Sequence, residues 1–304
     1  MKLHNITVLS SESEFADERL LKLKFAGTVT FMDSKRQSSL KDLIKISKNA
    51  DIIAFNSDEF GKYASRYLSE ILKASPNVKG LALNTNHADY VDMEYCRERS
   101  IKVVPILDYT AEAVAEHVIL LLLGCAKRLF INDRRTYRRR YQPELGFETR
   151  GRTLGVIGIN LEAQRVIGLA RAIGMIVYST ERFEGAVRQS SVLHNDMVTI
   201  HLPNTEENKK FLSKEKINRL KEGTIVINLS GRELVDEKGM AEALKTGKVA
   251  QYAFEAESLH KSPLEGIETA LMFKPFSRLT RESVVRNRYE WVKNIANLAG
   301  HHTS

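Results

Sequence analysis

The stretch LGVIGINLEA, residues 154–163, decides the fold, because an apolar run of strand length ends there in a glycine and a helical pattern begins. Further apolar runs of strand length follow, each separated from the next by a segment long enough for a helix. Strands that alternate with helical segments indicate βαβ units and a parallel sheet. The expected strands of this block lie at residues 154–158, 175–179, 197–201, 224–229, 249–254 and 270–273.

A similar alternation precedes this stretch. Short apolar runs at 51–55, 80–83 and 101–106 predict strands, and residues 60–73 show helical spacing. A long helix is expected over residues 110–129. It is apolar on most faces, so we expect it to be buried between elements or at a subunit contact. The predicted fold class is therefore α/β, with two doubly wound parallel-sheet domains.

Composition narrows the class of protein further. The 304 residues are 43% apolar and 28% charged, which excludes disordered and collagen-like chains. The longest apolar run, residues 118–123, falls far short of the roughly 18 residues that span a bilayer, and the N-terminus lacks the apolar core of a secretory signal. Cys96 and Cys125 lack metal-ligand spacing, so we expect no metal and a reduced, cytoplasmic setting. The net charge of +8 leaves an anionic partner open.

Several short motifs occur in order along the chain. They are DYVD at 89–92, DY at 108–109 with VAEH at 114–117, TRGRTLGVIG at 149–158, HLPNTEENK at 201–209, and LVD at 234–236 with AEAL at 241–244. Together they resemble the motifs of the D-isomer-specific 2-hydroxyacid dehydrogenases. The resemblance implies a substrate-type, flavodoxin-like domain formed by residues 1–107 and 276–304, and a Rossmann nucleotide-binding domain over residues 108–275. It also implies a homodimer with residues 111–150 at the contact.

The family's reaction moves a hydride between a 2-hydroxy acid and nicotinamide, and it requires an arginine to clamp the substrate carboxylate. The resemblance places that arginine in an N-x-[SA]-R-G loop. Here the loop reads NLSGR, residues 228–232, so Gly231 takes the clamp position and Arg232 follows it. Neighbouring side chains of an extended segment point to opposite sides, so Arg232 could serve as the clamp only in a rebuilt loop.

The two remaining catalytic positions are altered as well. The family's T-P-H turn is KPF at residues 274–276, and Phe276 cannot exchange a proton. In the EAESLH stretch, Glu255 matches the acid near the cofactor, and His260 falls at the catalytic glutamate position. Glu257 remains as a stand-in for that acid. All three of the family's catalytic positions are therefore altered, and the sequence leaves the catalytic residues of this chain unknown.

The phosphate-binding loop departs from the G-x-G-x-x-G pattern that lets backbone amides approach a pyrophosphate. Gly158 is kept, Asn160 replaces the second glycine and Ala163 is an accepted variant of the third. Glu162 adds a negative charge that would repel a pyrophosphate. Binding of NAD or NADP stays open. The remaining candidate cofactor residues are Glu181, with Arg182 beside it as an alternative contact for a 2′-phosphate, and His201, Pro203, Gly231 and Glu255.

The substrate loop reads Asn84-Thr85-Asn86-His87, where the family has a small residue and a glycine that present backbone amides to the carboxylate. Thr85, Asn86 and His87 are therefore the candidate substrate-binding residues. His87 is either a relocated acid–base group or a solvated loop histidine.

A polar, arginine-rich connection is expected over residues 132–151. Residues 134–141 hold five arginines and two tyrosines, a composition that also occurs where proteins bind single-stranded nucleic acid. Since the family uses this segment at its subunit contact, we expect arginines here to pair with acids such as Glu144 or Glu148 of a partner, and we do not expect nucleic acid.

These observations predict a 2-hydroxyacid dehydrogenase-like protein that is catalytically degenerate and acts as a dinucleotide- or ligand-binding, regulatory homodimer. The alternative is an active NAD(P)-dependent oxidoreductase of 2-hydroxy or 2-oxo acids with a rearranged site. In that alternative Arg232 clamps the carboxylate, and His87 or His260 exchanges the proton with help from Glu255 or Glu257.

Overall fold

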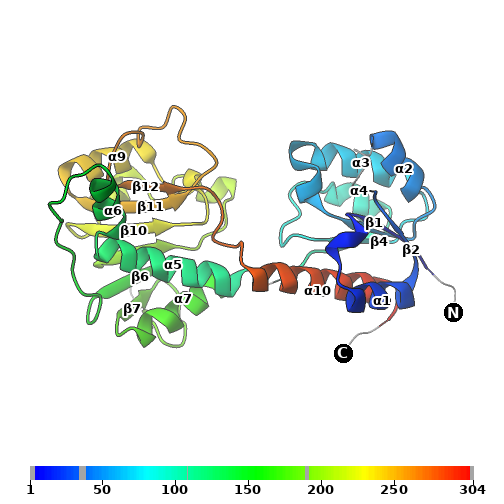
Figure 1. The fold of residues 1–304 in the computed structure, drawn as a ribbon, viewed down its shortest axis with the longest axis horizontal. Helices are drawn as coiled ribbons and strands as arrows, with labels where there is room; N and C mark the ends of the chain where they lie inside the picture. The colour runs from blue at the N-terminus through cyan, green and yellow to red at the C-terminus, as the bar shows by residue number, and fades with distance from the viewer. Residues whose placement is uncertain (1–3, 34–38, 108, 189–191, 302–304) are drawn as a thin grey trace. The chain divides into compact units, whose positions relative to one another are not determined.

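The computed structural model describes residues 4–33, 39–107, 109–188 and 192–301, and it divides into two compact units (Figure 1). Unit 1 comprises Met1–Tyr109 and Arg281–Ser304, and unit 2 comprises Thr110–Thr280. The boundaries predicted from the sequence, at 107/108 and 275/276, each lie a few residues before the observed ones. Asp108, which belongs to one of the motifs, lies outside the described residues.

Unit 1 is built on a five-stranded parallel sheet in the order β2-β1-β3-β4-β5. Every residue of β3 and β4 is buried, as expected for central strands covered on both faces. The order reverses between β1 and β3, as in flavodoxin-like folds. The strands are β1 (His4–Leu9), β2 (Gly27–Phe31), β3 (Ile52–Phe55), β4 (Gly80–Leu83) and β5 (Lys102–Val104).

Helices complete unit 1, and the last helix of the chain is one of them. Trp291 of this helix is fully buried, and its indole Nε1 donates a hydrogen bond to the Ala82 carbonyl at 3.1 Å. The contact ties the C-terminal helix to β4, 209 residues earlier in the chain. The helices are α1 (Asp17–Ala26), α2 (Leu40–Ser47), α3 (Ala64–Ala74), α4 (Met93–Glu98) and α10 (Arg281–Leu298).

Unit 2 is built on a seven-stranded parallel sheet in the order β12-β11-β10-β9-β6-β7-β8. The order reverses between β6 and β9, which marks the crevice where ligands of such sheets bind. The strands are β6 (Thr153–Ile157), β7 (Ile176–Ser179), β8 (Val187–Arg188), β9 (Met197–Ile200), β10 (Thr224–Asn228), β11 (Val249–Glu255) and β12 (Ala270–Phe273). The helices are α5 (Ala111–Ala126), α6 (Leu129–Tyr137), α7 (Leu161–Ala172), α8 (Lys214–Asn218) and α9 (Glu237–Thr246).

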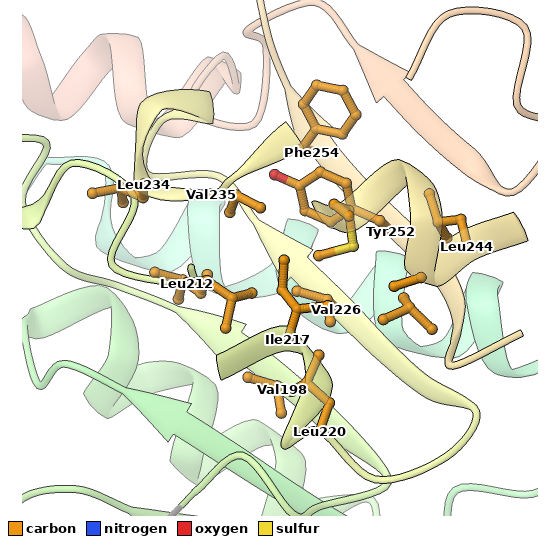
Figure 2. Close-up of a cluster of buried hydrophobic side chains, with 14 of the residues drawn as sticks. Val198, Leu212, Ile217, Leu220, Val226, Leu234, Val235, Leu244, Tyr252 and Phe254 are labelled. Atoms are coloured by element: carbon orange, nitrogen blue, oxygen red, sulfur yellow. The ribbon is translucent and has the colours of Figure 1, made fainter. Parts of the chain in front are cut away.

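The core of unit 2 has a cluster on each face of this sheet. Figure 2 shows the cluster that joins β9, β10 and β11 to α8 and α9, with the rings of Tyr252 and Phe254 stacked at a centroid distance of 4.6 Å. The second cluster joins the strands to α5 and α7. These clusters fix the strand ends, and therefore the loops at the carboxyl edge of the sheet, in place.

Two expectations about residues 110–151 need correction. The long helix predicted over 110–129 is interrupted, because Arg128 adopts a left-handed backbone conformation with φ of +55° between α5 and α6. The connection predicted from residue 132 is still helical as far as Tyr137, the last residue of α6. Within the described part of the chain, no helix is both long and apolar enough to cross a membrane.

Candidate nucleotide and catalytic site

The loop after β6 keeps the backbone geometry of a phosphate-binding turn. Gly158 has φ of +82°, and a Cβ atom there would lie 3.0 Å from the backbone carbonyl of His201, so the position requires glycine. Asn160 is the N-cap of α7, and its Oδ1 accepts a hydrogen bond from the Ala163 amide at 2.8 Å. One amide at this helix N-terminus therefore already donates to the chain's own side chain.

Glu162 adds a carboxyl group to the same turn. It is half-buried, and its Oε1 accepts a hydrogen bond from the Thr110 hydroxyl at 3.3 Å. Burial raises the pKa of Glu162 above its usual range, against the lowering effect of hydrogen bonds from Thr110 and Asn160. Where Glu162 is ionised, its charge favours the helix dipole but opposes a pyrophosphate.

His201 lies beside this loop at the end of β9. Its amide donates to the Ile157 carbonyl at 2.8 Å, and its Nε2 lies 3.0 Å from the Thr199 hydroxyl. The side chain is only 3% exposed, and burial lowers the pKa of His201 to about 4, so the imidazole is neutral at pH 7. Four of the candidate cofactor residues thus lie where the strand order reverses, namely Gly158, Asn160, Ala163 and His201.

The other cofactor candidates lie at neighbouring strand ends. Glu181 is exposed two residues beyond β7, which pairs with β6, and its carbonyl accepts a hydrogen bond from the Ser179 hydroxyl. Pro203 is exposed beyond His201. Both remain candidates, since neither side chain is buried in the core.

In the loop after β10, the clamp position Gly231 lies next to the side chains of Asn204 and Glu233. Gly231 has φ of +146°, and a Cβ atom there would lie 2.8 Å from the Asn204 amide nitrogen. That nitrogen is held in place because it donates to Glu233 Oε2 at 3.0 Å. The buried Asn228 fixes the loop from below by donating to the Gly231 carbonyl at 2.8 Å. A side chain at position 231 would be strained at this φ and would have to displace the exposed Asn204 side chain.

Arg232 is directed elsewhere. Its Nε and Nη2 donate to the two carboxylate oxygens of Glu237 at 2.8 and 2.7 Å, and its Nη1 donates to the Ser258 carbonyl. The bond to Glu237 raises the pKa of Arg232, against the lowering effect of burial. A forked pair of this kind satisfies the guanidinium, so Arg232 would have to leave Glu237 to clamp a substrate carboxylate.

Glu255 is hydrogen-bonded to the turn after β12 that contains Phe276. Glu255 accepts hydrogen bonds from the backbone amides of Phe276 and Ser277 at 2.9 and 2.7 Å, and from the Ser277 hydroxyl at 2.9 Å. The Phe276 ring packs edge-on against the His117 imidazole at a centroid distance of 4.9 Å. Glu255 therefore holds the turn after β12 in position, and no imidazole lies at position 276.

Sequence reasoning missed His117 as part of this neighbourhood and treated it only as one letter of the VAEH motif. Among the described residues, its Nε2 is buried without a hydrogen-bond partner, and burial lowers the pKa of His117. The available signal was helical spacing, since the buried Val114, Val118 and Leu121 place neighbouring positions of α5 against the core.

The remaining candidates in unit 2 are exposed. Glu257 Oε2 lies 3.1 Å from the Lys274 ammonium, so this carboxylate pairs with a lysine. His260 lies in the following turn, where its backbone amide donates to the Ser258 hydroxyl at 2.9 Å. Glu257 therefore faces a cation here and does not orient an imidazole.

Unit 1 contains an imidazole–carboxylate pair at the substrate loop. His87 Nδ1 contacts Asp89 Oδ1, and both side chains are exposed. The Thr85 hydroxyl donates to the His87 carbonyl and lies 2.9 Å from the Tyr90 hydroxyl, while Asn86 is exposed. The partner of His87 is thus Asp89, two residues away.

The arginine-rich segment makes ion pairs within its own chain. Arg135 Nη2 lies 2.7 Å from Glu144 and 3.0 Å from Glu268, and Arg134 donates to the Glu268 carbonyl. We expected Glu144 to pair with a partner's arginine, and it is already engaged by Arg135. Exposed side chains lie beyond this pair, namely Tyr137, Arg138, Arg139, Arg140, Tyr141 and Leu145.

The described residues contain no group of three or more His, Cys, Asp and Glu side chains placed to hold a metal ion. Cys96 and Cys125 are both buried as free thiols.

The strand order and the glycine turn after β6 are those of a Rossmann-type α/β domain. The family model "D-isomer specific 2-hydroxyacid dehydrogenase, NAD binding domain" matches residues 119–273, which is half of the chain. The chain therefore belongs to this family, and it is a D-2-hydroxyacid dehydrogenase-like protein with an NAD-binding domain.

Curated relatives are similar at moderate identity. A D-3-phosphoglycerate dehydrogenase of Archaeoglobus fulgidus is 26% identical over 248 residues, which cover 76% of this chain and 47% of the relative. The chain thus spans about half the length of that protein. A hydroxypyruvate reductase of Thermotoga maritima is 28% identical over 218 residues, which cover 68% of this chain and 69% of the relative.

Solved structures share the fold over nearly the whole chain. An acyclic imino acid reductase in complex with NADPH and D-Arg superposes with a TM-score of 0.80 at 20% identity and covers 98% of both chains. A D-lactate dehydrogenase from Aquifex aeolicus, in complex with NAD and lactic acid, has a TM-score of 0.76 at 24% identity and covers 98% of this chain and 96% of that one.

Proposed function

We propose that this protein binds NAD or NADP without performing the family's hydride transfer, and that it acts as a ligand-binding, regulatory homodimer. The observation that carries this proposal is position 231, where the chain has a glycine and therefore no guanidinium, while the neighbouring Arg232 is paired with Glu237. Without a clamp, a 2-oxo acid has no bidentate partner to hold its carboxylate beside nicotinamide.

The side chains nearest in the sequence to the altered catalytic positions are bound within the protein itself. Arg232 is bound by Glu237, Glu255 is bound by the turn at Phe276, and Phe276 has no proton to exchange. Rearranging these contacts for catalysis would break charge-assisted hydrogen bonds, which are the stronger ones in proteins. This distribution of bonds favours a stable fold over a rearranged active site.

Dinucleotide binding is supported by the family's NAD-binding domain and by the glycine turn at Gly158, which joins β6 to the N-terminus of α7. Asn160 and Glu162 weaken that site, and Glu181 and Arg182 would bias the choice between NAD and NADP in opposite directions.

The proposed dimer contact is the 111–150 region. Tyr137 is 90% exposed and Leu145 is 93% exposed, and large apolar side chains left in solvent are typical of interaction surfaces.

The test is calorimetric titration with NAD, NADH, NADP and NADPH, followed by turnover assays with a panel of 2-oxo acids. We expect saturable binding of at least one dinucleotide and no turnover. Turnover of about 1 s⁻¹ or more, the low end of ordinary kcat values, would overturn the proposal.

The second candidate is an active oxidoreductase with a relocated acid–base group, and the His87–Asp89 pair favours it. An imidazole oriented by a carboxylate is the arrangement that proton exchange near neutral pH requires. If any turnover is found, His87→Asn should lower kcat by about 10²–10⁴-fold, the usual contribution of a general acid–base group. A kcat that His87→Asn leaves unchanged would exclude this candidate.

A further inference from the structure

Phe276 presents an aromatic ring to solvent on the turn after β12. Its side chain is 44% exposed, and the remainder packs against two other rings. The Phe276 ring centroid lies 4.9 Å from that of His117 and 6.2 Å from that of Phe273, with interplanar angles of 78° and 79°. Steeply inclined rings with centroids about 4.5–7 Å apart are favourable aromatic pairs. Phe276 is therefore supported from within the protein and still accessible to a ligand.

The backbone beneath this ring is fixed as well. The Glu255 carboxylate accepts hydrogen bonds from the amides of Phe276 and Ser277 at 2.9 and 2.7 Å. No residue that the structure describes bonds to the buried Nε2 of His117, and burial lowers the pKa of His117, so this imidazole is mostly neutral at pH 7. A ligand at Phe276 would meet a ring that needs little ordering on binding and no charged imidazole behind it.

Helix α5 connects this ring with the phosphate loop. The Thr110 hydroxyl, immediately before α5, donates to Glu162 in the first turn of α7, and His117 contacts Phe276 seven residues later in the chain. Since an α-helix rises about 1.5 Å per residue, these two contacts lie about 10 Å apart along α5. Glu181 follows β7, and β12 lies on the other side of β6 from β7. A dinucleotide with its pyrophosphate at α7 and its adenosine toward Glu181 would direct its other half toward Phe276.

We propose that Phe276 contacts the nicotinamide ring of the dinucleotide and favours the oxidised, cationic ring over the reduced, neutral one. This inference rests on the proposed binding of NAD or NADP. The face of an aromatic ring attracts a cation through its quadrupole, and a neutral dihydropyridine lacks that attraction. The segments around Phe276 carry two acids, Glu255 and Glu257, and two bases, Lys274 and Arg278, so net charge favours neither form. The preference therefore comes from the ring, and ligand binding would report the oxidation state of the dinucleotide.

The experiment measures by calorimetry how tightly wild type, Phe276→Leu and Phe276→Tyr bind NAD, NADH, NADP and NADPH. ADP-ribose and its 2′-phosphate, which lack nicotinamide, report on the rest of the site. We expect Phe276→Leu to weaken binding of the oxidised form at least about threefold more than that of the reduced form, the size of an exposed cation–π contact. Binding of ADP-ribose should stay unchanged. Phe276→Tyr keeps an aromatic face and should keep the wild-type ratio of the two affinities.

Equal losses for the oxidised and reduced forms in Phe276→Leu would overturn the proposal, as would affinities that this variant leaves unchanged. A parallel loss of ADP-ribose binding would also contradict it, because the substitution would then act on the phosphate loop. A wild type that binds neither dinucleotide nor ADP-ribose would refute the proposed function together with this inference. ADP-ribose binding to wild type therefore separates the two failures, and unchanged melting temperatures would show that both variants fold.

Discussion

The loop after β6 and the loops after β10 to β12 lie at the same edge of one sheet. The first has the backbone turn of the family's motif, whereas the others differ from the family's motifs in their side chains. The turn at Gly158 keeps a backbone geometry in which any side chain would strike the His201 carbonyl. In the loops after β10 to β12, Gly231 carries no guanidinium, Phe276 carries no imidazole, and Glu255 is hydrogen-bonded to the turn at Phe276. Recognition by backbone amides survives side-chain substitution, whereas clamping and proton exchange require particular side chains.

Gly158→Ala tests the loop after β6 and should have the largest effect, a loss of dinucleotide affinity. The new Cβ atom meets backbone at 3.0 Å in a left-handed conformation, so the loop must move. We expect dinucleotide affinity to fall by about 100-fold, an estimate from a strain of 1–3 kcal/mol, as measured by calorimetry. The matched control is Gly168→Ala within α7, where a Cβ atom meets nothing within 4 Å and stability should rise by up to about 1 kcal/mol.

His201, beside the loop after β6, makes the stability of the fold depend on pH. Its pKa is lowered to about 4 in the folded protein, so the unfolded chain binds this proton more readily. Its contribution to stability is therefore present above its unfolded pKa and is lost as pH falls toward 4. The loss should be about 2 kcal/mol between pH 7 and pH 5. Urea unfolding of wild type and His201→Gln should show a shallower pH slope for the variant, and identical slopes would contradict this assignment.

Arg232→Gln tests whether the altered region is structural. Removing the guanidinium breaks the fork to Glu237, a pair whose side chains are 27% and 17% exposed. The expected loss of stability is about 1–2 kcal/mol, after allowing for partial solvent screening. A double-mutant cycle with Glu237→Gln measures the pair itself. A coupling energy near zero would show that Arg232 is free for another task.

Glu162→Gln should produce the smallest effect, and it acts in the opposite direction. Burial raises the pKa of Glu162, so lowering the pH neutralises it earlier than an exposed glutamate and should tighten dinucleotide binding in the wild type. The variant removes the charge at every pH. We expect up to about tenfold tighter NADH binding at pH 7, equivalent to about 1.4 kcal/mol, with a flatter pH dependence. Weaker binding in the variant would mean that Glu162 contributes a favourable contact.

Much of the fold followed from apolar runs, but the side-chain contacts of the site did not. The strands at 80–83 and 270–273 were predicted at their observed bounds, because buried parallel strands read as continuous apolar segments. The break at Arg128 was not predictable, since an arginine carries no signal for a left-handed conformation. The pairing of Arg232 with Glu237 depends on how the loop after β10 turns, and spacing along the sequence does not encode that turn.

The most direct test of the central claim is deuterium transfer from deuterated NADH and NADPH to a panel of 2-oxo acids, followed by mass spectrometry of the products. The protein should be saturated with dinucleotide, as established beforehand by calorimetry. We predict that no labelled 2-hydroxy acid forms above the rate without protein, because Gly231 carries no guanidinium to clamp the carboxylate and Phe276 exchanges no proton. Enzyme-dependent formation of a labelled 2-hydroxy acid would contradict the account.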